Sequence, residues 1–336
     1  MNIAAQLSKY CQPFSRYERC FMNRKWLDLR KYIQRFPIAV EKVYSTSSSP
    51  SFELELLRSI IKSLVSIKNK LIETNMNNQD NFISACSAYI SLLTIFLANC
   101  KPSFPDMNNK LDNLINYVLL YITVDHTLDS NPQLLTLFKI IFQKIIKNKD
   151  YNEDIGNDNN VKIAVYYLKN IIQSSPQSVP YIIKAASSEF KSVEIQGNKH
   201  DTLKTCYDKG ETSATAGCSV LTDGHILNGC EIMGRLGQLF DDIIDVGIDM
   251  NSNFQTFATQ CYIKDGNVDT AITVFAQEFD KLPFEYDGVK SVMLYVISTI
   301  LLNSEFISED MRLTFQKYSL LLYNGGYHSE SLFYFI

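Results

Sequence analysis

The sequence is poor in glycine and proline, the residues that punctuate a chain, and in histidine. Its 336 residues include only 13 glycines, 9 prolines and 4 histidines. Alternating strands bounded by hairpin turns, which depend on glycine and similar residues, are not evident. The eight cysteines form no CxxC pair, so with so few histidines a structural zinc site is not expected.

An excess of charge of one sign is also absent. Lysine and arginine total 32 against 36 aspartates and glutamates, which leaves a net charge of −4. Proteins that bind nucleic acid over a wide surface carry a clear basic excess, so we expect no nucleic-acid partner. A local basic pocket for an anion remains compatible with this balance.

A long run of purely apolar residues is missing as well. The first twenty residues contain no apolar stretch between a basic start and a small-residue cleavage site, so no export signal is expected. The most apolar segment, residues 82–98, contains Ser and Thr and is interpreted as a buried core helix. We therefore expect a cytoplasmic protein with reduced thiols and no stable membrane insertion.

Helical spacing of apolar residues dominates the sequence that is present. It predicts an all-α protein of roughly ten to thirteen helices. No linker is long enough to demand a domain boundary, so we predict a single domain over residues 1–336, with residues 1–50 as an N-terminal helical extension. The apolar stripes occupy residues 54–65, 111–122, 132–147, 161–174, 222–250, 268–281, 288–303 and 309–323.

Several aspartates recur at helical spacing in the apolar segment 236–250, LGQLFDDIIDVGIDM. Asp241, Asp245 and Asp249 are each four residues apart, which places them on one helix face beside Asp242. Carboxylates so close to one another repel unless water or cations share them. Mg²⁺ prefers carboxylate oxygens and completes its shell with water and substrate phosphates. The stretch predicts either a magnesium site or a solvated acidic face.

A second acidic pair, Asp125 and Asp129, has the same spacing. The preceding turns of that helix carry Leu114, Val118 and Tyr121. One helix would therefore offer a carboxylate pair at its end and an apolar wall below it. The simpler interpretation is a helix end, because Asp129 is followed by Ser, Asn and Pro.

Small residues accompany the first aspartate stretch. Gly234 and Gly237 lie on its upstream face, where they leave room for a ligand or for a closely packed helix. Two such helices facing each other would form a deep apolar pocket with an acidic mouth. That shape suits a long apolar substrate that carries a diphosphate.

These motifs resemble those of the class I terpenoid synthase superfamily. DDIID at 241–245 resembles the second aspartate-rich motif of trans-isoprenyl diphosphate synthases, and DHTLD at 125–129 resembles their first, with His126 in place of an aspartate. YDKGETSATAG at 207–217 is similar to the Lys-Thr-Gly segment that precedes the second motif. The resemblance covers residues of about 50–330 and implies the all-α isoprenoid synthase helical bundle.

The resemblance also implies a chemistry. Asp125 and Asp241 would be the central catalytic residues, and with Asp129, Asp245 and Asp249 they would hold up to three Mg²⁺ on the diphosphate. The metal ions would stabilise the diphosphate as a leaving group and leave an allylic cation in the apolar pocket.

Further residues gain roles from the same resemblance. Lys209 would bind the diphosphate, although a surface lysine is the simpler interpretation. Arg312 is another candidate diphosphate ligand, and Lys317-Tyr318 resembles the Arg-Tyr pair of terpene synthases, although lysine lacks the bidentate fork of arginine. Tyr121 would stabilise the cation through its aromatic face.

Departures from the resemblance help to choose a reaction. Chain-elongating relatives bind isopentenyl diphosphate through extra basic residues, but the SNPQLLTLFK that follows Asp129 contains no arginine, and the later NSNFQT contains no lysine. We therefore predict a terpene synthase that ionises and cyclises a prenyl diphosphate, in particular farnesyl diphosphate, to a sesquiterpene.

Two alternatives stay open. One is a short-chain trans-isoprenyl diphosphate synthase, a prenyltransferase. The other is a non-catalytic homologue that acts as a partner subunit, which the replacement at His126 leaves open. The resemblance also allows a homodimer.

Overall fold

The structure is a computed structural model that describes residues 52–76, 79–99, 104–147, 149, 158–196, 201–286, 301–302 and 304–324. Within these residues there are twelve α-helices and no strand, which confirms the predicted all-α class. The N-terminal extension predicted for 1–50, and most of the helix predicted for 288–303, lie outside the described residues.

By its internal contacts the chain divides into two compact units. The first comprises Phe52–Arg235, and the second contains the described residues from Leu236 onward. Each unit is described by itself, and the single domain expected over 1–336 stays a prediction.

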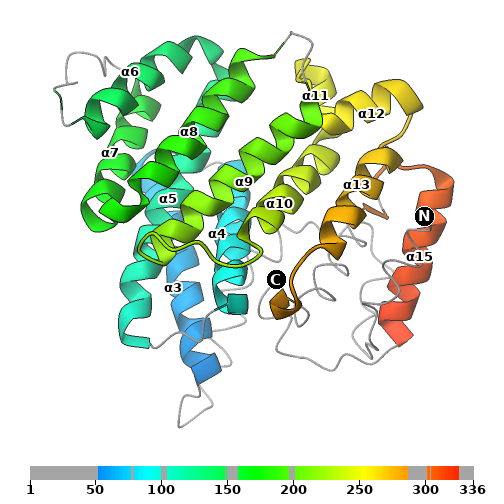
Figure 1. The fold of residues 1–336 in the computed structure, drawn as a ribbon, viewed down its shortest axis with the longest axis horizontal. Coiled ribbons are helices and arrows are strands. Elements are labelled where there is room, and N and C mark those ends of the chain that lie inside the picture. Colours follow the sequence, from blue (N-terminus) through cyan, green and yellow to red (C-terminus); the bar gives the residue numbers. More distant parts are fainter. Residues whose placement is uncertain are drawn as a thin grey trace. The chain divides into compact units, whose positions relative to one another are not determined.

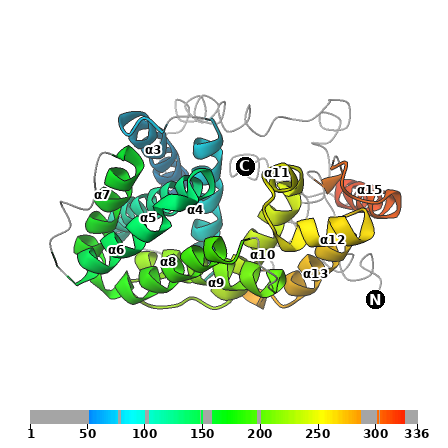
Figure 2. The ribbon, with the colours of Figure 1, turned by 90° about the horizontal axis from the view of Figure 1, so that it is seen from above.

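The helices of the first unit are gathered around one long helix. This central helix contacts five others of the unit, and Figures 1 and 2 show it enclosed among them. Two short 3₁₀ turns, Pro132–Leu134 and Pro176–Ser178, directly precede the helices Leu135–Ile146 and Val179–Glu194. The elements are α3 (Phe52–Glu73), α4 (Gln79–Asn99), the central α5 (Phe104–Ser130), α6 (Leu135–Ile146), α7 (Asn159–Ser174), α8 (Val179–Glu194), α9 (Thr202–Leu221) and the first turns of α10 (Cys230–Ile244).

The sequence of α5 explains its central position. Leu114, Ile115, Val118 and Leu119 are all fully buried, so apolar side chains point to more than one side of the helix. A helix that is apolar nearly all round is stable only when other helices cover it. The polar residues at its C-terminal end, near Ser130, are therefore held at the edge of a packed core.

Helix α4 contains the most apolar segment of the chain. Ala85, Cys86 and Tyr89 on this helix are fully buried, which confirms the expected core helix. Of the helices that the structure describes, none combines the length and the apolarity needed to cross a membrane.

The second unit is built of shorter helices. Phe275 and Phe279 stack in its core, with ring centroids 6.2 Å apart. The backbone N–H of Ser308 donates to Asp269 Oδ1 at 3.0 Å and ties two segments of this unit together. After the end of α10, the elements are α11 (Val246–Ser252), α12 (Phe257–Asp265), α13 (Asp269–Asp280), the 3₁₀ turn Phe284–Tyr286 and α15 (Glu309–Asn324).

The apolar stripe predicted over 222–250 is not one helix. A turn follows α9, in which Gly224 and Gly229 adopt φ values of +95° and +75° that favour glycine. Helix α10 begins only at Cys230 and ends at Ile244. The prediction was wrong here because hydrophobic periodicity records which residues are buried and does not register a short turn between them.

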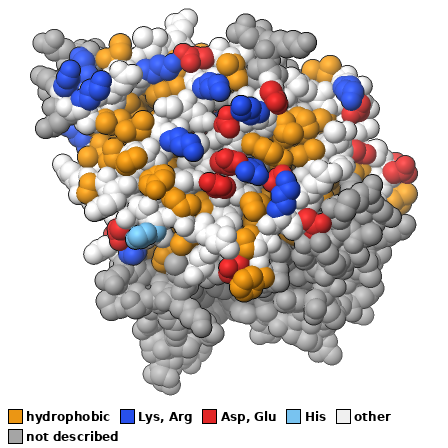
Figure 3. Space-filling model, in the orientation of Figure 1, with side chains coloured by type: hydrophobic (Ala, Val, Ile, Leu, Met, Phe, Trp, Pro, Cys, Tyr) orange, Lys and Arg blue, Asp and Glu red, His pale blue; other side chains and the backbone are white. Residues whose placement is uncertain are grey.

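The described side chains on the face drawn in Figure 3 carry charges of both signs. Lysines and arginines lie among aspartates and glutamates on this face, without separation into a basic and an acidic half. The described part of this face therefore has the mixed character that the overall charge balance indicates.

Candidate functional site

Two residues that the sequence analysis selected from separate motifs meet in the first unit. The Lys209 ammonium on α9 donates a hydrogen bond of 2.7 Å to Asp125 Oδ1 on α5, although 84 residues separate them. Each side chain is only 18% exposed. The contact therefore joins the DHTLD motif to the segment 207–217 within the packed unit.

A third charged residue, Glu189 on α8, completes this arrangement. Its Oε2 lies 3.2 Å from Lys209 Nζ, and its side chain is 5% exposed. That oxygen accepts no hydrogen bond. The sequence analysis missed Glu189, although it lies on the buried side of α8 with Ile182, Phe190 and Val193, where a charged residue is costly without a partner.

Two more predicted residues contribute to the electrostatic surroundings of Lys209. Tyr121 and Asp129, one helical turn before and after Asp125, both help to raise the pKa of the lysine. We call Asp125, Asp129, Glu189 and Lys209 the Lys209 cluster. It contains three carboxyl groups and one ammonium, with the ring of Tyr121 beside it.

The imbalance of charge shifts the pKa values within the cluster. Burial favours the neutral form of Asp125, but the Lys209 ammonium, with smaller contributions from His126 and Glu189, holds the pKa of that carboxyl below its usual value. Burial likewise opposes the charge on Lys209, and Asp125 and Glu189 reverse the effect, so its pKa lies well above the usual value.

The other two carboxyl groups shift in the opposite direction. Burial, together with the charges of Asp125 and Asp129, raises the pKa of Glu189 to about 8 against the attraction of Lys209. Although the Asp129 residue lies at the exposed end of α5, crowding by protein atoms and the charge of Asp125 raise its pKa to about 7. One ammonium is thus insufficient for three carboxylates, and a further cation would relieve the excess.

His126 has its hydrogen-bond partner outside this cluster. Its Nδ1 shares a hydrogen bond with Asn81 Oδ1 on α4. It lines a cavity of about 360 Å³ whose other walls include Thr127, Ser130 and Asn160. The residue that replaces an aspartate of the resembled motif is therefore used in packing α5 against α4.

The second acidic stretch lies in the second unit and differs from the single helix expected over 236–250. Helix α10 ends before Asp245, and α11 begins after it. Nevertheless, Asp245 N–H donates to Asp241 O, and Asp249 N–H to Asp245 O, both at 2.9 Å. The helical four-residue spacing of these three aspartates is thus retained across a local bend.

Burial distinguishes the carboxylates of this stretch. Asp241 is exposed, whereas the neighbouring Asp242 is 6% exposed. Gln238 Nε2 donates to Asp242 Oδ1 at 3.0 Å and lies 3.5 Å from Asp241 Oδ2. The amide of Gln238 therefore orients the start of the acidic stretch.

The two predicted glycines have different surroundings. A Cβ added to Gly234 would lie 2.2 Å from the carbonyl oxygen of Gly210 and 2.7 Å from Ala214 Cβ, so α9 and α10 approach closely at this point. A Cβ added to Gly237 would meet no atom within 4 Å. The first glycine allows close packing of helices, and the second borders open space.

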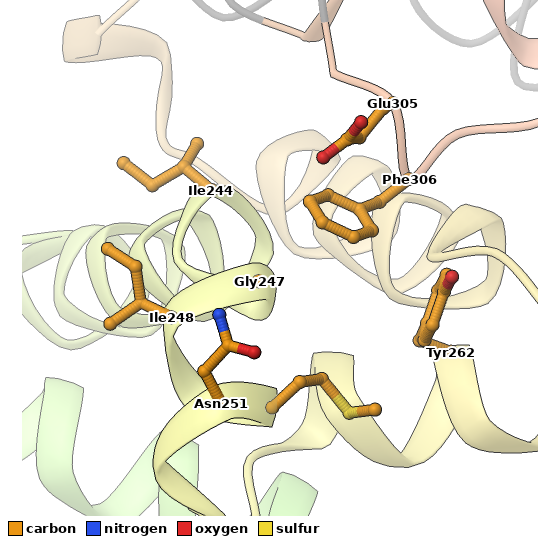
Figure 4. A pocket seen from close by; sticks show the side chains of 8 residues that line it. Ile244, Gly247, Ile248, Asn251, Tyr262, Glu305 and Phe306 are labelled. Carbon is orange, nitrogen blue, oxygen red and sulfur yellow. The ribbon is translucent and has the colours of Figure 1, made fainter.

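A cavity of about 430 Å³ lies on another side of the α10–α11 bend, within the second unit. In Figure 4 the ring of Phe306 lies over Gly247, and a Cβ added to Gly247 would lie 2.9 Å from its Cζ. The α10–α11 part of the cavity wall is formed by residues that lie between the aspartates or directly after Asp249, and the aspartates themselves do not line it. The lining residues are Ile244, Gly247, Ile248, Met250, Asn251, Tyr262, Glu305 and Phe306.

Of the residues proposed as diphosphate ligands near the C-terminal end, only Arg312 has a described side chain, and its role stays a prediction. Arg312 donates from Nη2 to the carbonyl oxygen of Ser304 at 2.9 Å and pairs with Glu309 at 3.4 Å. These contacts hold its guanidinium against the backbone that precedes α15. Lys317 and Tyr318 are helical, but their side chains lie outside those described.

The two apolar residues expected to line a substrate pocket are Leu114 and Val118. Both are fully buried in the core of the first unit. Core packing accounts for this burial, and a role in lining a pocket stays a prediction.

In the described part of the chain, no group of three or more His, Cys, Asp or Glu side chains is arranged to hold a metal ion. This finding concerns only sites in which three or more of the metal ligands are protein side chains. Mg²⁺ is commonly bound through one or two carboxylates, with water and substrate phosphates as the remaining ligands. Asp125 and Asp129, with their excess of negative charge, are compatible with a site of that kind.

Comparisons with known proteins add no relative. No protein-family model, no curated protein and no solved structure matches this chain.

Proposed function

We propose that this protein is a class I terpene synthase that ionises and cyclises a prenyl diphosphate, in particular farnesyl diphosphate, with Mg²⁺. The observation that carries the proposal is the 2.7 Å contact between Lys209 and Asp125. Both residues were selected from the sequence as diphosphate and metal ligands, from motifs far apart in the chain. Their contact is expected if both serve one anion-binding site.

The chemistry of the cluster supports a divalent cation at this position. Three carboxyl groups share one ammonium, and burial together with the charge of neighbouring carboxylates raises the pKa values of Asp129 and Glu189. Asp125 and Asp129 would hold Mg²⁺ in the first unit, and a metal-binding role for Asp241, Asp245 and Asp249 stays an expectation from the resemblance. When bound, the metal would polarise the diphosphate and stabilise it as it leaves.

The residues of the chain would then act directly on the substrate. Lys209 would donate a charge-assisted hydrogen bond to a diphosphate oxygen. Tyr121, one turn below Asp125, would face the carbon chain and stabilise the allylic cation through its ring. The apolar body of α5 would exclude water from that cation.

Product analysis by gas chromatography and mass spectrometry tests the proposal. The purified full chain is incubated with Mg²⁺ and geranyl, farnesyl or geranylgeranyl diphosphate, each with and without isopentenyl diphosphate. We expect a volatile hydrocarbon or alcohol from farnesyl diphosphate alone, and its loss when the metal is chelated.

Two other outcomes would replace the proposal. A longer prenyl diphosphate formed only with isopentenyl diphosphate would identify a prenyltransferase. No turnover of any of these substrates would favour a non-catalytic partner subunit.

A further inference from the structure

The ammonium of Lys209 occupies the same carboxylate that the metal would need. Its hydrogen bond to Asp125 is 2.7 Å long, and Asp125 is partly buried, so solvent screening at this pair is weak. A divalent cation at Asp125 would be repelled by the ammonium beside it. When no diphosphate is present, the Lys209 ammonium therefore opposes the binding of a metal ion at Asp125.

Glu189 offers Lys209 a second partner. Its Oε2 lies 3.2 Å from Lys209 Nζ, is buried and accepts no hydrogen bond in this arrangement. A small shift of the ammonium away from Asp125 would allow it to donate to that oxygen instead. The position of Lys209 between the carboxylate of Asp125 and the carboxyl group of Glu189 thus provides two alternative pairings for one cation.

We propose that Lys209 is a resident counter-cation that competes with the metal for Asp125, and that Glu189 is the positioning residue that holds Lys209 when the metal takes Asp125. This inference rests on the proposed function for the identity of the metal site. A diphosphate, which attracts both cations, removes their repulsion. Lys209 therefore makes the affinity for the metal depend on diphosphate. By thermodynamic linkage, the affinity for diphosphate then depends on the metal to the same degree.

The experiment is a Mn²⁺ titration of the full chain, followed by electron paramagnetic resonance, with and without inorganic diphosphate. In Lys209→Gln we expect Mn²⁺ alone to bind about tenfold more tightly than in the wild type, and diphosphate to enhance the binding less. In Glu189→Gln the ammonium has only Asp125 as a partner, so we expect Mn²⁺ alone to bind several-fold more weakly.

Matched controls separate pairing from general charge effects. Glu194→Gln, on the same helix as Glu189 but paired with Lys139 at the surface, should leave Mn²⁺ binding unchanged. Lys209→Arg keeps the positive charge and can hold Asp125 with a bidentate fork, so it should weaken Mn²⁺ binding. The Arg variant also decides the question if Lys209→Gln does not fold, as judged by circular dichroism.

Two results would overturn the inference. One is Mn²⁺ binding in Lys209→Gln that equals or falls below the wild type, or, if that variant does not fold, wild-type affinity in Lys209→Arg. The other is an absence of Mn²⁺ binding to every form under both conditions, which would also remove the metal from the proposed function. Variants that behave as expected while no prenyl diphosphate is turned over would support the inference and reject the terpene synthase.

Discussion

The two acidic motifs of this protein neutralise their charge in different ways. In the first unit, Asp125 is paired with Lys209 at the edge of a packed core, and Glu189 approaches the same ammonium. In the second unit, Asp241 is exposed, and the neutral amide of Gln238 orients the neighbouring carboxylate. A largely buried carboxylate requires a cation of the protein itself, whereas an exposed carboxylate remains in contact with water. The first motif should therefore couple stability to function, and the second should separate them.

The largest expected effect is a loss of product formation when Asp241, in the exposed motif, is replaced. Asp241→Ala should lower the rate of product formation by at least about a hundredfold, because it removes a direct metal ligand from the proposed site. Its thermal unfolding temperature should stay close to that of the wild type, because Asp241 is exposed. The rate is measured by product analysis and the unfolding by circular dichroism.

The matched control for that change is Asp310→Ala, at an exposed position of α15 in the same unit. It should affect neither quantity. Equal losses in both variants, or a large drop in the stability of Asp241→Ala, would contradict the separation expected for this motif.

The next effect is on the stability of the first unit. Lys209→Met leaves the largely buried carboxylate of Asp125 without its ammonium, which should reduce the free energy of unfolding by about 3 kcal/mol. Chemical denaturation followed by circular dichroism measures the loss. Lys139→Met, which removes a surface pair with Glu194, should cost less than about 1 kcal/mol. A similar small cost in both variants would show that the buried pairing contributes little.

The raised pKa of Glu189 should be detectable in the pH dependence of the free energy of unfolding. Its pKa in the folded protein is about 8, above the ordinary value of 4.5. Between these values the unfolded chain is ionised while the folded protein keeps the proton, so unfolding releases a proton and stability falls as pH rises. Glu189→Gln removes this loss, and its stability relative to the wild type should rise across the window by at most about 1.4 kcal/mol per pH unit.

Thermal unfolding in the presence of a metal chelator, at several pH values between 5 and 8, tests this trend. The difference in slope between Glu189→Gln and the wild type should correspond to about one proton released on unfolding. Glu194→Gln, on the exposed side of α8, should show no such trend. A difference between Glu189→Gln and the wild type that is independent of pH would reject the raised pKa.

The smallest effects concern the glycines of α10. Gly234→Ala places a methyl group against the backbone of Gly210 and should destabilise the protein by about 1–3 kcal/mol. Gly237→Ala meets no neighbour and should stabilise the helix by about 0.5–1 kcal/mol. Chemical denaturation of both variants measures the change in the free energy of unfolding, which should be a loss for Gly234→Ala and a gain for Gly237→Ala. A gain in both variants would refute the close approach of the helices at Gly234.

Much of the secondary structure was predictable because helical periodicity is local. The stripes over 161–174, 268–281 and 309–323 correspond to α7, α13 and α15. The stripe over 222–250 failed, because a turn with two glycines at positive φ interrupts it and Asp245 lies at a bend. Such interruptions leave the spacing of buried residues nearly unchanged, so the pattern does not detect them.

The candidate site was predictable in part. Asp125 and Lys209 were selected from short motifs, and the structure brings them together. Glu189 carries no motif, and its only signal is a charge on the apolar side of α8. Arg312 was selected by type and place in the chain, but its contacts with backbone carbonyl groups became visible only in the structure.

The sequence by itself determined the helices, the placement of the aspartates one turn apart, and the apolar body of α5, since each follows from residues within a few positions of one another. Only the tertiary structure decided which charges meet. Lys209 reaches Asp125 and Glu189 because α9 packs against both α5 and α8. Helix packing depends on side chains distant in the chain, so one ammonium came to be shared by carboxylates from two other helices.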